Sequence, residues 1–408
     1  MSHDKRSGTQ DEPDISSGMV LLLAIAAGVI VANLYYAQTL VGPISQATGL
    51  SPQAAGLIVT LTQIGYTIGL LFIVPLGDIL ENRKLVVGAL LLTACALLTA
   101  AFSTTGWVFL AAALVIGLGS VAAQVLVPFA AHLSKEATRG HVVGKVVSGL
   151  LLGIMLARPV ASLVADYSNW HVVFGGAAVL VLVLAALLRS KLPTRVPSSP
   201  LPYTRLIASL WTLFATTPLL RRRAAYQAGL FGSFSLFWTV TPLMLAGPVF
   251  HLSQTGIAIF ALVGMAGAIA SPIAGRLADA GHTIPATGAA LALGVVGFAL
   301  PLLVPGSREV ALGVLVLASI ILDMGVAANL VIGQRAIFGM DAAARSRLNG
   351  LYLAFFFAGG ALGSALGGYM FATYGWHAAL LTGMAFPGLA LAYWLSEFLP
   401  STRSRKAA

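Results

Sequence analysis

The chain has 408 residues, of which 58% are hydrophobic and only 9% are charged. A soluble domain carries about 25% charged residues, so this composition excludes an ordinary soluble protein and indicates a chain that folds inside a bilayer. The formal net charge of +10 would by itself suit a nucleic-acid partner, and its distribution along the chain decides whether that interpretation holds. The single cysteine, Cys95, excludes an intrachain disulfide.

Twelve apolar runs follow a polar stretch at residues 1–18, which we predict to be a disordered cytoplasmic tail. Each run is close to the roughly 20 residues that a membrane-spanning helix needs, and is too long for a strand of an outer-membrane barrel. The predicted spans are 19–41, 54–76, 85–104, 107–131, 142–164, 170–188, 224–247, 255–275, 284–304, 309–334, 347–371 and 376–397. The sequence therefore predicts an all-α membrane protein with twelve transmembrane helices.

One block of sequence occurs twice, with the copies separated by about half the length of the chain. Arg139, Gly144, Gly153 and Trp170-His171 recur as Arg345, Gly350, Gly359 and Trp376-His377. The repeat predicts two pseudo-symmetric six-helix bundles, at 19–189 and 223–397, with a cytoplasmic linker at 190–222 and a cytoplasmic tail at 398–408. Two such halves in a membrane usually enclose a binding site and move about it, which indicates transport.

The basic residues are distributed unevenly between the two sides of the membrane. With the N-terminus inside and twelve crossings, every Lys and Arg except Arg158 and Arg308 falls in a tail or loop on the N-terminal side. This positive-inside bias predicts a multi-pass membrane protein with both termini in the cytoplasm. The charge thus reports orientation, and no nucleic-acid partner is expected.

A short motif follows the second helix of each predicted half. Residues 76–84 read LGDILENRK and residues 275–282 read GRLADAGH. Both resemble the G-x-L-A-D-R-x-G-R-K signature of the major facilitator superfamily, although Val74 replaces the leading Gly and Ile79 the Arg in the first copy. The resemblance implies a cytoplasmic gate in which carboxylates bind helix N-termini and arginines. Its residues would be Gly77, Asp78, Arg83, Lys84, Gly275, Arg276 and Asp279. A purely structural charge cluster is the alternative.

Small residues spaced four apart mark the fifth and eleventh predicted helices. They resemble the G-x-x-x-G-P-x-x-G-G motif that antiporters of this superfamily carry on helix 5, and they let helix backbones approach closely. The resemblance implies an interbundle seam, with tight packing as the alternative; its residues would be Gly153, Ala157, Gly359, Gly363 and Gly367. The resemblance covers essentially the whole chain and is greatest to bacterial proton-coupled exporters of drugs, sugars or nucleosides. Ala113 stands where many drug exporters have an arginine.

Two charged residues lie well inside predicted spans, where an ionisable group costs about 2.5–3.5 kcal/mol. Asp323 on the tenth helix is the candidate proton-coupling site, with a structural hydrogen-bonding role as the alternative. Arg158 on the fifth helix is a candidate partner for Asp323 or for an anionic substrate, and the alternative is that it extends outward to the membrane surface.

Polar and aromatic residues gather on the helices that line the central cavity in the resembled fold. Amides and hydroxyls give directional contacts and rings give contact area, although helix packing is the alternative role for each. The candidates are Asn33, Tyr36, Gln38, Gln63, Tyr66, Gln124, Phe234, Trp238, Asn329, Gln334 and Tyr352. The three phenylalanines at 355–357 lie on the same predicted helix as Tyr352.

Motifs of enzymes are absent from the sequence. It contains no H-E-x-x-H, G-x-S-x-G or phosphate-binding loop, so we expect no enzyme activity, no cofactor, no metal and no self-contained ATP-driven pump. The prediction is a monomeric secondary transporter that exports a small organic compound in exchange for protons. An importer or uniporter of the same fold is the first alternative, and a non-transporting membrane receptor or scaffold is the second.

Overall fold

The computed structural model describes residues 15–197, 202–303, 307–340 and 344–398, and helices make up nearly all of these ranges. The predicted tails lie outside the described residues except at 15–18 and 398. There α1 already begins at Ser17, because the hydroxyl of Ser16 accepts a hydrogen bond from the backbone N–H of Met19 at 3.2 Å and so caps the helix.

The first half of the chain folds into helices that follow the predicted spans. They are α1 (Ser17–Ala32), η1 (Tyr36–Thr39), α2 (Val41–Thr48), η2 (Pro52–Ala54), α3 (Leu57–Phe72), η3 (Val74–Asp78), α4 (Asn82–Ala101), α5 (Gly106–Ser120), α6 (Ala122–His132), α7 (Arg139–Tyr167) and α8 (Trp170–Lys191). The short 3-10 segments continue or re-aim the long helices, as at the ends of α1 and α3.

The second half begins with a helix from the predicted linker. Its elements are α9 (Tyr203–Thr216), α10 (Pro218–Ala246), α11 (Gln254–Gly264), η4 (Met265–Ile269), α12 (Ala270–Asp279), α13 (Thr283–Leu303), α14 (Arg308–Phe338), α15 (Arg345–Leu395) and η5 (Ser396–Phe398). The seventh predicted span starts earlier than expected, because Pro218 opens α10 and its fixed φ suits the first turn of a helix.

Ten continuous stretches of the described residues are long and apolar enough to cross a membrane. The last, Arg345–Phe398, has 54 residues and holds two predicted crossings. Gly375 separates them with a φ of 82°, a conformation that only glycine adopts readily. The first predicted crossing corresponds to three elements, α1, η1 and α2, of which α1 is a shorter apolar helix of 16 residues. The described helices thus match the twelve predicted crossings.

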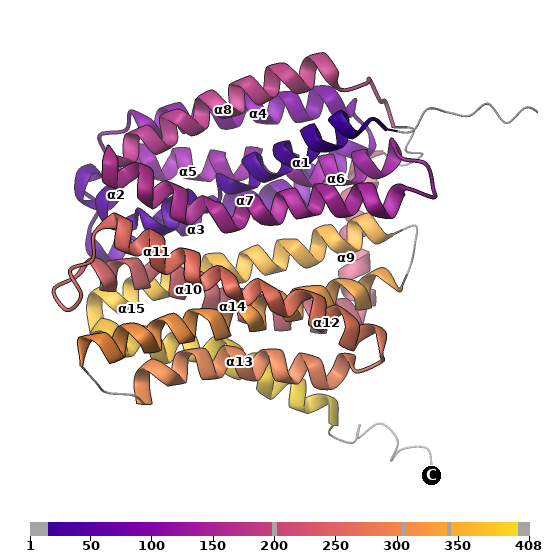
Figure 1. Cartoon of the computed structure of the whole chain (residues 1–408). Helices are drawn as coiled ribbons and strands as arrows, with labels where there is room; N and C mark the ends of the chain where they lie inside the picture. Colours follow the sequence, from indigo (N-terminus) through magenta and orange to yellow (C-terminus); the bar gives the residue numbers. More distant parts are fainter. Residues whose placement is uncertain (1–14, 198–201, 304–306, 341–343, 399–408) are drawn as a thin grey trace, which may run out of the picture.

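The helices pack as two groups side by side (Figure 1). In the first group α1 packs on α7, α3 on α5 and α4 on α8; in the second, α10 packs on α15 and α13 on α14. Between the groups α3 contacts α15 and α7 contacts α11. Both ends of the described chain lie on one side, at the right of Figure 1. We call this the terminal side, and the other the opposite side.

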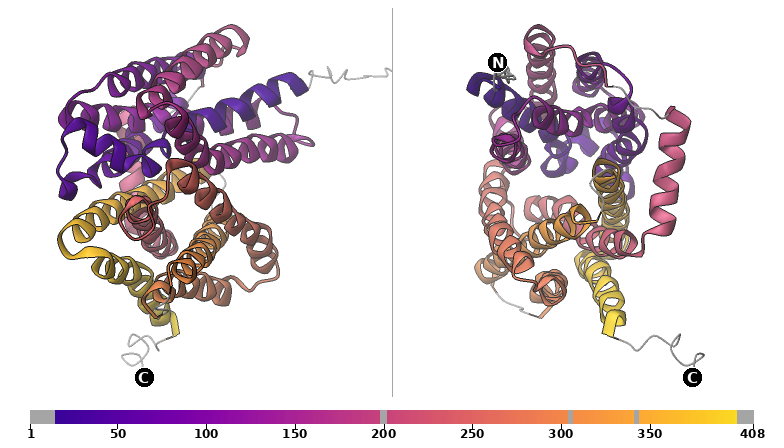
Figure 2. Two further views of the ribbon diagram at one scale, coloured as in Figure 1. Left: turned by 60° about the vertical axis from the view of Figure 1, so that its left-hand side comes forward. Right: turned by 90° about the vertical axis from the view of Figure 1, so that its right-hand side faces the viewer.

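Helix α9 lies beside both groups at the terminal side (Figure 2, right). The Tyr203 hydroxyl donates to the carbonyl of Phe72 in the first group at 2.8 Å. Arg347 in the second group donates to the Ser209 hydroxyl at 2.9 Å, and the ring of Phe214 stacks on Phe355 at 4.6 Å. The linker helix therefore contacts both groups.

The residues predicted to form the interbundle seam face helices of their own group, so this prediction is wrong. A Cβ on Gly363 would lie 1.9 Å from the carbonyl oxygen of Gly232 in α10, and Gly359 and Gly367 also pack on α10, within the second group. Gly153 likewise packs on α1 of its own group, against Gly28, and Ala157 is one turn further along the same face. These small residues bring helices together inside each group, because close approach needs small residues wherever backbones meet.

The contact between the groups uses the adjacent face of α15. A Cβ on Gly368 would lie 2.7 Å from the Cα of Gly56, and one on Gly360 would lie 2.6 Å from the Oε1 atom of Gln63. Because successive residues point about 100° apart around a helix, Gly360, Ser364 and Gly368 face the other group although each follows a glycine of the internal face.

Candidate substrate and coupling site

The two groups are closed against each other on the opposite side. The hydroxyls of Thr60 and Ser364 lie 2.8 Å apart in a hydrogen bond, and the hydroxyl of Thr255 donates to a carboxylate oxygen of Asp166 at 2.5 Å. Nearer the middle, Gln63 donates from Nε2 to the Ser235 hydroxyl at 2.8 Å. These polar contacts join α3 to α15, α7 to α11 and α3 to α10.

A cavity of about 350 Å³ separates the groups on the terminal side. Its lining residues come from both groups: Leu70, Val74, Gln124, Val127, Pro128, Ala131, Val143, Phe338, Arg345, Ser346, Asn349, Gly350 and Leu353. Of the eleven cavity candidates, Gln124 lines it. Arg345 and Asn349 were missed as cavity residues. Arg345 lies in a predicted loop and Asn349 at the start of a predicted helix, and the sequence does not show that the two groups are separated by a cavity there.

Arg158 and Asp323 lie on different groups and are connected through one tryptophan. The Arg158 guanidinium carbon lies 4.0 Å from the centre of the Trp238 ring and 5.1 Å from that of Phe234, which are cation–π distances. The indole Nε1–H of Trp238 donates to Asp323 at 3.2 Å. Arg158 is 3% exposed and Trp238 is fully buried, whereas Asp323 is half-buried. The predicted partnership is thus indirect, with an aromatic ring between the charges.

A chain of buried aromatic rings, which we call the aromatic wall, leads from the cavity-lining residue Gln124 toward this charged pair. We define it as Tyr66, Phe357, Phe231, Phe234 and Trp238, whose successive ring centres lie 4.4, 5.3, 5.1 and 6.4 Å apart. At its cavity end the Tyr66 hydroxyl accepts a hydrogen bond from Gln124 at 3.0 Å. Phe231 was missed because an aromatic residue in a long apolar run carries no distinguishing signal.

The remaining cavity candidates fall into two further places. Asn33, Tyr36 and Gln38 are buried near the end of α1 and in η1, where the Asn33 amide donates to the carbonyl of Ile30 in its own turn at 3.1 Å. The three candidates Asn329, Gln334 and Tyr352 of the second group hydrogen-bond to neighbours within that group. Asn329 donates to Gln227 at 2.6 Å, Tyr352 to the carbonyl of Asn329 at 3.5 Å, and Gln334 to Asn349 at 3.2 Å.

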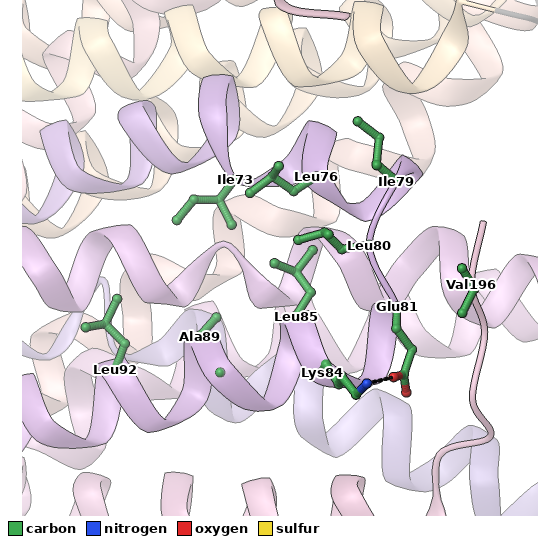
Figure 3. A pocket seen from close by; sticks show the side chains of 11 residues that line it. Ile73, Leu76, Ile79, Leu80, Glu81, Lys84, Leu85, Ala89, Leu92 and Val196 are labelled. Atoms are coloured by element: carbon green, nitrogen blue, oxygen red, sulfur yellow. Dashed lines mark ion pairs between the residues drawn. The ribbon is translucent and has the colours of Figure 1, made fainter. Parts of the chain in front are cut away.

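The first gate motif is organised around a residue that the prediction left out. Glu81 pairs with Arg83 at 3.3 Å and with Lys84 at 3.1 Å, whereas Asp78 is exposed. Figure 3 shows the Lys84–Glu81 pair beside a surface cavity of about 660 Å³ formed by η3, α4 and Val196. That cavity includes no residue of the second group, so it is not placed to hold a substrate between the groups.

Three further contacts complete the two motifs. In the first, the Asn82 amide donates to the carbonyl of Gly77 at 2.6 Å and accepts from Arg195 of the linker at 3.1 Å. In the second, Asp279 pairs with Arg335 of α14, while Arg276 is exposed. A Cβ on Gly275 would lie 3.2 Å from that Arg335 side chain, so the glycine leaves room for it. Arg195 and Arg335 are far from the motifs in sequence and were not predictable from them.

Two groups of membrane helices, joined on one side and parted by a cavity on the other, define a membrane transporter. Residues 23–338 match the family model described as Major Facilitator Superfamily, and the chain belongs to this superfamily. The chain is similar to the uncharacterized transporter YgaY of Escherichia coli O157:H7, with 37% identity over 96% of this chain and 98% of YgaY.

One further relative agrees in class, and one solved structure agrees in fold. A probable transporter of Streptomyces coelicolor is 32% identical over 87% of this chain and 82% of its own length. The crystal structure of a mutant of the nucleoside transporter NupG has a TM-score of 0.74 and 15% identity, over 93% of this chain and all of NupG. At that identity the second similarity establishes the fold alone. The predicted superfamily and fold are therefore confirmed.

Proposed function

We propose that the protein is a monomeric secondary transporter of a bacterial inner membrane, which exports a small organic compound in exchange for protons by alternating access. The observation that carries this proposal is the Arg158–Trp238–Asp323 connection. It places an ionisable acid of the second group in contact, through one ring, with a buried cation of the first. A change in the charge of Asp323 therefore acts across the surface between the two groups.

The proposed coupling is electrostatic. Ionised Asp323 attracts the Arg158 guanidinium through Trp238 and favours the contact between the groups on the opposite side. A proton on Asp323 removes that attraction and shifts the population of the two states. The other ionisable group near Arg158 is Tyr35, which is neutral at physiological pH. In this scheme Asp323 is the group that changes charge.

The basic residues support an orientation in the membrane that is compatible with export. Arg83, Arg195, Arg335 and Arg345 all lie at the terminal side with the gate motifs, which supports a cytoplasmic position for that side. The cavity then opens to the cytoplasm, and the closed side faces the periplasm. A cytoplasmic compound would enter along Gln124 and leave after the Thr60–Ser364 contact opens. The gate motifs would close the terminal side in the other state.

The coupling can be tested in proteoliposomes. Ligands are first found by thermal-shift screening of the purified protein with drugs, sugars, nucleosides and amino acids, and the best ligand is then followed as a transported solute. We expect Asp323→Asn to retain exchange of the ligand but to lose accumulation driven by a pH gradient. Glu309→Gln, an exposed acid at the start of the same helix, is the matched control and should behave as wild type.

Each alternative predicts another result. If Asp323→Asn keeps gradient-driven transport at the original rate, the coupling assignment is wrong. If the wild type shows ligand counterflow but no transport that depends on a pH gradient, a uniporter is favoured. If the ligand accumulates in the direction in which protons flow, an importer is favoured. A receptor or scaffold would show no ligand-dependent change in the accessibility of cysteines placed across the α7–α11 contact.

A further inference from the structure

We propose that the substrate is a small aromatic carboxylate, whose anionic group binds Arg158 and whose ring packs on the aromatic wall. This inference rests on the proposed function and names its substrate class. It starts from Arg158, whose Nε and Nη1 atoms are buried without a hydrogen-bond acceptor in the described part of the chain. A guanidinium has five donors and no acceptor capacity, and a buried unpaired cation is strongly destabilising. Such a group calls for an anion.

Asp323 does not supply that anion in this state. Its carboxylate accepts from the Trp238 indole, and the Trp238 ring lies under the guanidinium. The described residues form no ion pair within 4 Å between Arg158 and any carboxylate. The Nε and Nη1 atoms of the guanidinium therefore have no acceptor among the described residues and would pair with the anionic group of a ligand that reaches them, while the face of the guanidinium is held by the rings of Trp238 and Phe234.

Two more buried polar groups without described partners belong to the same region. The amide of Gln38 is fully buried, and neither its nitrogen nor its oxygen has a hydrogen bond. Its neighbour Thr39 donates to the carbonyl of Arg158 at 3.4 Å, which joins η1 to α7 at this point. Ser162, one turn after Arg158 on α7, also has an unpartnered buried hydroxyl. Buried polar groups are almost always satisfied, so a ligand that accepts hydrogen bonds fits this region.

The aromatic wall determines the rest of the substrate. It connects the cavity at Gln124 with Arg158 through Tyr66 and three phenylalanines. Flat rings favour offset or edge-to-face contacts with other rings, and Phe356 adds a stacked contact with Phe231 at 3.7 Å. A ligand with one planar ring and one carboxylate would use the wall and the arginine together, whereas a neutral ligand would leave the arginine without an anion.

The test measures binding of matched probes to the purified full chain, by isothermal titration calorimetry. The probes are benzoate against benzamide, and indole-3-acetate against indole-3-acetamide, so that each pair has the same ring and nearly the same shape but an anionic carboxylate or a neutral amide. We expect the carboxylate to bind at least about tenfold more tightly than its amide, because a charge-assisted pair is worth more than a neutral one. Empty micelles of the same detergent correct for partitioning.

Variants assign the binding to Arg158. We expect Arg158→Gln to remove the preference for the carboxylate, and Arg158→Lys to weaken it, because lysine keeps the charge without the planar fork of donors. Arg223→Gln is the matched control, since Arg223 is also a buried arginine (5% exposed) but donates to Thr287 within the second group. Asp323→Asn should tighten carboxylate binding by removing the competing negative charge. Arg158→Lys and Asp323→Asn keep the test decisive if Arg158→Gln does not fold.

Three results would overturn the inference: no probe binds, the amides bind as tightly as the carboxylates, or Arg158→Lys and Asp323→Asn both leave carboxylate binding unchanged. Any of these, together with proton-driven transport of another compound, would leave the proposed function standing. Conversely, carboxylate binding that depends on Arg158, without any proton-driven transport, would refute the proposed function and retain the site.

Discussion

Replacement of Gly363 by alanine should destabilise the protein through one contact inside the second group. A Cβ at this position would lie 1.9 Å from the carbonyl oxygen of Gly232, and backbone atoms cannot rotate away as a side chain can. Overpacking of this kind costs about 1–3 kcal/mol. Replacement of a helical glycine by alanine also gains up to about 1 kcal/mol of helix propensity, so a control must remove this contribution.

Gly176 provides that control. It lies inside α8, is exposed, and a Cβ there would meet no atom within 4 Å. Both substitutions carry the same propensity gain, so the difference between Gly363→Ala and Gly176→Ala isolates the packing cost. We expect Gly363→Ala to be less stable than Gly176→Ala by about 1–3 kcal/mol.

The free energy of unfolding would be measured by denaturant titration of the detergent-solubilised protein, with circular dichroism and intrinsic fluorescence as independent probes. Coincident transitions in the two probes would justify a two-state treatment. Equal stability of the two variants would refute the packing assigned to Gly363, because it would show that α10 and α15 do not approach closely at this residue.

Two further predictions concern the surface between the groups. In a cysteine-free background, Thr60→Cys with Ser364→Cys should form a disulfide that stops transport until a reductant is added. The reason is that the 2.8 Å contact between the two hydroxyls must open in each transport cycle. Transport at the original rate in the cross-linked protein would contradict this closure. Trp238→Phe keeps a ring beneath Arg158 but removes the donor to Asp323, so the number of protons moved per ligand should fall while ligand exchange continues. An unchanged ratio in reconstituted vesicles would show that the indole has no part in coupling.

Which of the predicted positions act together depends on contacts that sequence spacing does not report. Gln63 does bond across the surface between the groups, to Ser235, and Tyr66, which accepts from Gln124 of its own group, packs on Phe357 of the other. Asn329, Gln334 and Tyr352 hydrogen-bond instead to residues of their own group. The polarity of a buried helix position predicts that it needs a partner, but it does not predict on which element the partner lies.

The sequence by itself determined the membrane class, the approximate positions of the helices and the break between the spans 347–371 and 376–397. These features are local, because a span depends on the length of an apolar run. Only the tertiary structure decided that Gly363 faces α10 while its neighbour Ser364 faces α3, and that Trp238 lies between Arg158 and Asp323. The reason is geometric. Adjacent residues point about 100° apart around a helix, so the face that meets a neighbour is set by the rotation and packing of whole helices.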